Sequence, residues 1–282
     1  ICQFLIINFQ FRNFKHLIKR QKKYIQVRSS RQMFGPIFDR LDKYFWEDLK
    51  VPNRMNESHL VSHKVLFGIR AILAIYSSVV VTIQTIKIPN IGAFVEFLTF
   101  WGALNVQWYF LFTMIEMITF RINKKPSYYV RIWKFTHLMF EFAFCTQPLI
   151  VLVFWGFIVP QLGDISQFGG LNIIFNSQLH GGFFIAIVID FVINNIQFYK
   201  RHMIVIYFLT FVYGLINMSY SLIWSPVYPG ITWKNWQTYF IFGVGLVLFF
   251  LISLLAQYIF KKWKAKNIEK LKDSYICQDY YF

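Results

Sequence analysis

The sequence predicts an all-α, polytopic membrane helix bundle with about six transmembrane helices, preceded by a basic amphipathic N-terminal segment. Hydrophobic residues make up 56% of the 282 residues and charged residues only 15%, which is more apolar surface than a soluble core needs. The apolar residues gather in stretches long enough to cross a hydrocarbon core about 30 Å thick. The bases mostly flank these stretches, so the formal net charge of +16 indicates a membrane surface and excludes nucleic acid as a partner.

The first 60 residues are expected to form a basic extension. Residues 1–38 contain many lysines and arginines and no acid before Asp39, a composition typical of a mitochondrial targeting segment. A basic tail that lies on anionic lipid headgroups is the alternative. Segment 36–50 is too short and too charged to span a membrane, but its apolar residues recur at helical spacing. It is therefore expected to be an amphipathic interfacial helix.

The six expected spans form a transmembrane domain over residues 61–262. They cover residues 65–86, 94–120, 131–158, 179–199, 202–223 and 236–260. The outer connections contain only the bases Lys87 and Lys234, whereas the tails and the inner connections contain most of the others. Because lysine and arginine gather on the inner side of a membrane, this alternation predicts that both termini lie there. Residues 263–282 are expected to be a basic and aromatic C-terminal tail.

The connection 159–178 between the third and fourth spans is expected to be the longest outer connection. It contains Pro160, Gly163, Gly169 and Gly170 and no base. Such a segment is typical of a loop, and it either stays an ordinary loop or folds back over the outer mouth of the bundle as a lid.

Ionisable side chains inside spans are costly, about 2.5–3.5 kcal/mol each on insertion scales, so each needs a partner, water or a function. The expected spans contain Arg70, Glu96, Glu116, His137, Glu141, His180 and Asp190. Arg70 and Glu116 lie near inner ends, where snorkelling or mutual pairing would explain them. Glu96 lies at an outer end, where water reaches it.

A buried polar network is expected from His137, Glu141 and Asp190. His137 and Glu141 are four residues apart and share one face of the third span, while Asp190 lies near the middle of the fourth. Asn194 and Asn217 would be within reach. Such a network either holds helices together or forms a proton relay or substrate site.

The cysteines predict neither a disulfide framework nor a metal site. Cys2, Cys145 and Cys277 are scattered, and no histidine lies near them at metal-ligand spacing. The sequence therefore predicts no metal and no cofactor.

Thr99 and His180 are expected at similar depth near the outer side of the membrane. The second and fourth spans both run from outside to inside, and each of these residues lies near the start of its span. Asp190 is ten residues beyond His180 and so lies about 15 Å deeper, too far to orient the imidazole. A threonine hydroxyl beside an imidazole can act as nucleophile and general base in acyl transfer.

Several short motifs resemble the androgen-induced protein family. They are the run Phe97-Leu98-Thr99-Phe100-Trp101, the pair Tyr109-Phe110, His180 with an acid ten residues later, and the turn Val227-Tyr228-Pro229. The resemblance covers about residues 65–260. It implies a six-span fold with both termini on one side, and intramembrane hydrolysis of fatty acid esters of hydroxy fatty acids. It also implies that Thr99 is the nucleophile and His180 the catalytic histidine.

Three functions remain open at this stage. The first is a lipid-ester hydrolase with membrane lipids around it and a fatty acid ester as substrate. The second is a non-catalytic accessory subunit of a mitochondrial inner-membrane respiratory assembly, with protein partners in that complex. The third is a small transporter or channel whose pathway contains His137, Glu141 and Asp190. The mitochondrial inner membrane is the favoured location, with the endoplasmic reticulum and the plasma membrane as alternatives.

Overall fold

A computed structural model gives the fold of two compact units, residues Ile1–Lys50 and Val51–Phe282. It describes residues 31–46, 55–87, 96–123, 130–162, 170–228 and 231–265. The first unit contributes one described helix, α2 (Arg31–Trp46), whose apolar and charged residues lie on different faces. The sequence places this helix at 36–50, so it begins five residues earlier than expected. The basic residues 1–30 lie outside the described residues.

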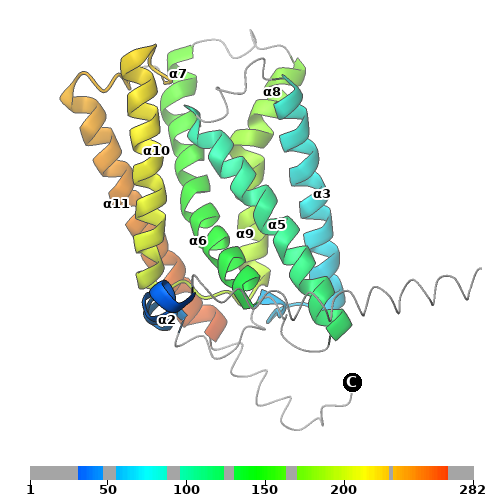
Figure 1. Ribbon diagram of the computed structural model, residues 1–282. Coiled ribbons are helices and arrows are strands. Elements are labelled where there is room, and N and C mark those ends of the chain that lie inside the picture. Colours follow the sequence, from blue (N-terminus) through cyan, green and yellow to red (C-terminus); the bar gives the residue numbers. More distant parts are fainter. Residues whose placement is uncertain are drawn as a thin grey trace, which may run out of the picture. The chain divides into compact units, whose positions relative to one another are not determined.

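The second unit is an all-α bundle. Its long helices are α3 (His63–Lys87), α5 (Leu98–Asn123), α6 (Val130–Val153), α9 (Phe183–Ile193), α10 (Met203–Ile223) and α11 (Trp236–Ile259). They run alternately up and down, and α5 packs between α3 and α6 (Figure 1). α6 also contacts α9, α10 and α11, so it is the central helix of the bundle.

Short helical segments extend several of these helices. The π-helix η2 (Phe154–Ile158) and α7 (Val159–Leu162) continue α6. Helix α8 (Gly170–Ser177) and the π-helix η4 (Gln178–Gly182) lead into α9. The 3-10 turn η5 (Lys200–His202) precedes α10, and the π-helix η6 (Phe260–Lys264) follows α11.

Five of the described helical segments are long and apolar enough to cross a membrane, which makes the chain a multi-pass membrane protein. They are His63–Ile86, Ile132–Ile158, Ile173–Ile193, Lys200–Ile223 and Trp236–Lys264. The second expected span corresponds to α5, which has 26 residues and is about 39 Å long. α5 is not one of these five segments. It carries the polar residues Asn105, Gln107 and Glu116, and Asn105 donates a hydrogen bond to the Met139 carbonyl of α6 at 2.8 Å.

Three expected boundaries of the third and fourth spans are wrong. The helix begins at Gly170 rather than 179, and α7 continues the third span to Leu162, so most of the expected loop 159–178 is helical. The residues between, 163–169, lie outside the described residues, and with them any lid. At its other end the helix stops at Ile193 instead of 199.

The early end of α9 has a local cause. Asn194 adopts an extended conformation, with ψ of 167°, and its side-chain oxygen accepts a hydrogen bond from the Ile196 N–H at 3.0 Å. Asparagine side chains compete in this way with helical hydrogen bonds. Residues 194–199 therefore form an extended break, although the apolar residues Ile196 and Phe198 are buried like those of a span.

A buried ion pair links α3 to α9. Arg70 Nε donates to Asp190 Oδ1 at 2.7 Å, and both side chains are 0% exposed. The Tyr109 hydroxyl and the Asn194 amide donate to the other carboxylate oxygen, while the Met55 carbonyl accepts from the guanidinium. The sequence predicts snorkelling of Arg70 or its pairing with Glu116. The structure instead pairs Arg70 with Asp190, a buried carboxylate on another helix.

Candidate functional site

The structure brings Thr99 and His180 together. Thr99 lies in the first turn of α5 and His180 in η4, and Thr99 Oγ1 is 3.2 Å from His180 Nε2. Thr99 is only 8% exposed. The distance is within the range of a hydrogen bond between a nucleophile and its general base.

The second ring nitrogen of His180 fixes the tautomer. Nδ1 lies 2.9 Å from the backbone carbonyl oxygen of Asn176, one turn earlier in the same helix. A carbonyl can only accept a hydrogen bond, so Nδ1 carries the proton in the neutral imidazole. Nε2 is then unprotonated and accepts from the Thr99 hydroxyl. His180 Nε2 is therefore oriented as a base toward the proton of the Thr99 hydroxyl.

Two π-helical segments place the imidazole. The ring of Phe154 in η2 stacks on His180 with centroids 3.5 Å apart and planes 11° apart. The Tyr76 hydroxyl of α3 donates to Gln178 Oε1 at 2.6 Å and so ties η4 to a neighbouring helix. Single π-helical turns are frequent at functional sites because they displace one side chain from the regular helical register. Here η4 carries His180 itself.

Thr99 lines an apolar cavity of about 130 Å³. The walls come from the start of α5, from α6 and η2, from α10 and α11 and from the connection between these two helices. Phe154, Tyr213, Tyr228 and Trp233 are among the lining residues. A largely apolar cavity with a few polar groups at one end is typical of a site for a small hydrophobic ligand.

Two tyrosine hydroxyls cap the start of α5. The Leu98 N–H donates to the Tyr213 hydroxyl at 3.0 Å and to the Tyr228 hydroxyl at 2.8 Å. The Tyr213 hydroxyl donates to the Glu96 carbonyl at 2.9 Å, and the Tyr228 hydroxyl lines the same cavity as Thr99. Burial raises the pKa of Tyr228, so its hydroxyl is protonated at neutral pH and can donate beside the nucleophile.

The wall of the cavity contains an unusual backbone conformation. Trp233 has a φ of 58°, a region that residues other than glycine seldom occupy. Its indole nitrogen donates to Asn217 Oδ1 at 2.8 Å, and the Asn217 amide donates to the Glu96 carbonyl at 3.3 Å. These bonds hold the tryptophan ring against the cavity.

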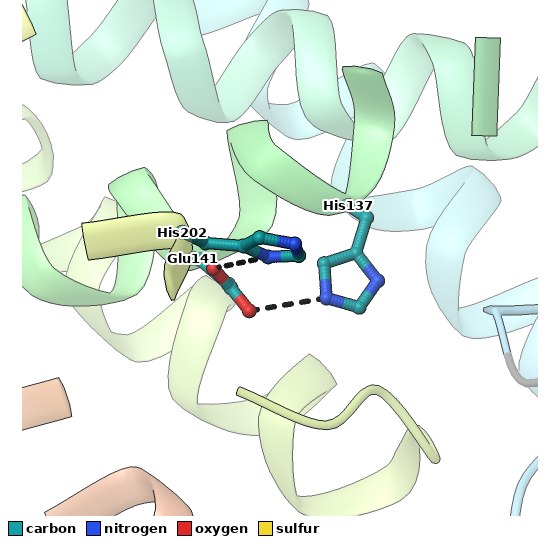
Figure 2. Close-up of side chains that lie close together, drawn as sticks. All are labelled: His137, Glu141 and His202. Carbon is teal, nitrogen blue, oxygen red and sulfur yellow. Dashed lines mark hydrogen bonds and ion pairs between the residues drawn. The ribbon is translucent and has the colours of Figure 1, made fainter. Parts of the chain in front are cut away.

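The remaining polar residues singled out in the sequence fall into three separate places. His137 and Glu141 lie together on α6, joined by His202 of η5 (Figure 2). Asp190 and Asn194 belong to the buried ion pair with Arg70. Asn217 lies beside the Thr99 cavity instead.

Sequence reasoning missed three participants in these sites. His202 is the first residue of an expected span, Tyr228 lies in the connection between two expected spans, and Lys264 lies in the segment expected to be a tail. Lys264 is in fact 0% exposed and donates to the Phe191 carbonyl and to Asn194 Oδ1. A signal was present for Tyr228, since it stands in one of the motifs of the family resemblance.

The chain matches no family model, no curated protein and no solved structure. The resemblance to the androgen-induced protein family therefore stays a prediction, and the role of the Thr99–His180 pair is inferred from its own geometry.

Proposed function

We propose that this protein is an intramembrane hydrolase of lipid esters, with Thr99 as nucleophile and His180 as general base. The observation that carries the proposal is the 3.2 Å contact between Thr99 Oγ1 and His180 Nε2. The other ring nitrogen, Nδ1, is hydrogen-bonded to the backbone carbonyl of Asn176. The apolar cavity beside Thr99 supports an acyl chain as the bound group. The family resemblance points to fatty acid esters of hydroxy fatty acids as the substrate class.

The geometry supports a two-step reaction. Thr99 Oγ1 attacks the acyl carbon while its proton passes to His180 Nε2, and the protonated imidazole then gives this proton to the departing alcohol. The product is an acyl-threonine. A water molecule that gives its proton to His180 attacks the acyl carbon, the bond to Thr99 breaks, and the fatty acid leaves as Thr99 regains its proton.

Tyr228 is the candidate donor to the oxyanion of the tetrahedral intermediate. Tyr228→Phe removes the hydroxyl and keeps the ring, and it is expected to lower kcat by about 10²–10³-fold, as loss of one oxyanion donor does. Kinetics with a fatty acid ester in detergent would test this. A rise in KM with unchanged kcat would instead assign Tyr228 to substrate binding.

The nucleophile can be tested with a fluorophosphonate probe on the purified protein in detergent. Wild type is expected to be labelled at Thr99, with the modified residue identified by mass spectrometry, because the activated hydroxyl attacks phosphorus as it would an acyl carbon. Thr99→Ala is expected to lose labelling and ester hydrolysis.

The matched control is Thr210→Ala, a threonine that lines the same cavity. Its hydroxyl donates to the Ile206 carbonyl of its own helix at 2.9 Å and does not serve the imidazole. This variant should be labelled like wild type. Labelling of Thr99→Ala to the wild-type extent, with the protein monodisperse in both cases, would refute Thr99 as nucleophile.

A second candidate function is a non-catalytic accessory subunit of a respiratory assembly in the mitochondrial inner membrane. The basic composition of residues 1–38, typical of a targeting segment, favours it. The Thr99–His180 pair would then bind lipid without reacting. Absence of labelling, together with co-purification of respiratory subunits from mitochondria, would select this function.

A further inference from the structure

A second polar cluster lies in the first half of α6, at the side where α9 ends and α10 begins. The Glu141 carboxylate lies between two imidazoles, with Oε1 3.1 Å from His137 Nε2 and Oε2 2.9 Å from His202 Nδ1 (Figure 2). The three side chains are only 3%, 1% and 0% exposed. Glu141 and His202 are 61 residues apart in sequence, which is why no ligand spacing revealed the cluster.

Backbone groups of the extended break complete the surroundings. The Gln197 carbonyl oxygen lies 2.9 Å from His137 Nε2, and the Tyr199 N–H donates to Glu141 Oε1 at 3.0 Å. A carboxylate so fully buried needs a positive charge beside it. The positive charge can come from a protonated imidazole, or from a metal cation that the neutral imidazoles and the carboxylate bind together.

The donor set favours the cation. Two histidines and one glutamate are a recurrent ligand set of zinc, with Zn–N and Zn–O distances of about 2.0–2.2 Å. Ligand atoms around such an ion lie about 3.3 Å from one another, and all three donor atoms here lie within 4.8 Å of one another. The neighbouring Gln197 carbonyl is placed to be a fourth ligand, through its oxygen.

We propose that His137, Glu141 and His202 bind one zinc ion. Binding replaces the two hydrogen-bonded protons, so that His137 Nε2 and His202 Nδ1 each become a ligand while the ring proton moves to the other nitrogen. The ion ties the middle of α6 to the start of α10 and holds the break at 194–199 between them. This role does not depend on the proposed hydrolase activity.

The test is metal analysis of the full chain, purified in detergent, stripped with a chelator and then dialysed against zinc chloride. Wild type is expected to retain about one zinc ion per chain and to unfold at a higher temperature than the stripped protein. His202→Gln and Glu141→Gln are expected to lose the ion. Glu141→Gln keeps the shape of the side chain and replaces one accepting oxygen by a donating amide, so loss of the ion counts only where the variant stays monodisperse and helical.

The control is His59→Gln. His59 is another buried histidine, bonded to Asn195 Oδ1 at 2.9 Å, and its replacement should leave zinc binding unchanged. X-ray absorption of the zinc-loaded wild type should show two imidazoles and oxygen ligands. Failure of folded wild type to retain zinc, retention in Glu141→Gln, or a sulfur ligand in the spectrum would each overturn the proposal.

Discussion

His180→Ala is expected to lower ester hydrolysis by about 10²–10⁴-fold, the contribution of a positioned general base and acid. The effect is large because the same nitrogen accepts the Thr99 proton and later donates to the leaving alcohol. Steady-state hydrolysis by the purified protein in detergent measures it. Fluorophosphonate labelling of Thr99 should fall in parallel, since the hydroxyl is no longer activated.

Added imidazole distinguishes lost chemistry from lost structure. In His180→Ala the space beside Phe154 can admit a free imidazole, which should restore part of the rate, whereas a misfolded variant would not respond. His59→Gln serves as the control, because it removes a buried histidine elsewhere in the bundle and should hydrolyse esters like wild type. Activity of His180→Ala within about tenfold of wild type would exclude this residue as the base.

Asp190→Asn is expected to destabilise the folded protein by about 3–5 kcal/mol. The substitution leaves the Arg70 guanidinium, which is 0% exposed, without its carboxylate. The free energy of unfolding can be followed by denaturant titration in detergent micelles. The loss should be far greater than for a surface substitution, which usually changes stability by less than about 0.5 kcal/mol.

The paired replacement Arg70→Met with Asp190→Leu separates buried charge from packing. Removing both partners leaves neither half of this ion pair buried alone, so the double variant should recover most of the stability lost in Asp190→Asn. Equal destabilisation of the single and double variants would show that packing around Tyr109 and Asn194, rather than the unpaired charge, causes the loss.

The sequence predicts the helices well because a span needs a certain length of apolar residues and nothing else. The expected end of the fourth span is wrong because a polar side chain competes with the helix there. The apolar run continues through Ile196 and Phe198, but Asn194 ends α9 by bonding the backbone ahead of it. No measure of hydropathy detects that bond. The helical start at Gly170 has a different cause: the glycine pair Gly169-Gly170 indicates a loop, yet Gly170 begins α8.

The candidate site was partly predictable. Span direction puts Thr99 and His180 at one depth, and the structure places them in contact, although catalysis by them stays a prediction. Partners across the bundle could not be predicted. Arg70 pairs with Asp190, 120 residues away, and Asn217 joins the cavity rather than the network with His137. Helix neighbours decide these contacts, and a single sequence does not reveal them.

The break at 194–199 also bears on how the chain is inserted into a membrane during synthesis. Backbone groups that no helix pairs would be costly in lipid. Two side chains of α6 satisfy such groups in the break: Glu141 accepts from the Tyr199 N–H, and His137 donates to the Gln197 carbonyl. α6 is made before this segment leaves the ribosome. The acceptor Glu141 and the donor His137 are therefore already made when the break emerges, and α10 can be added to a half-built bundle without first crossing the bilayer alone.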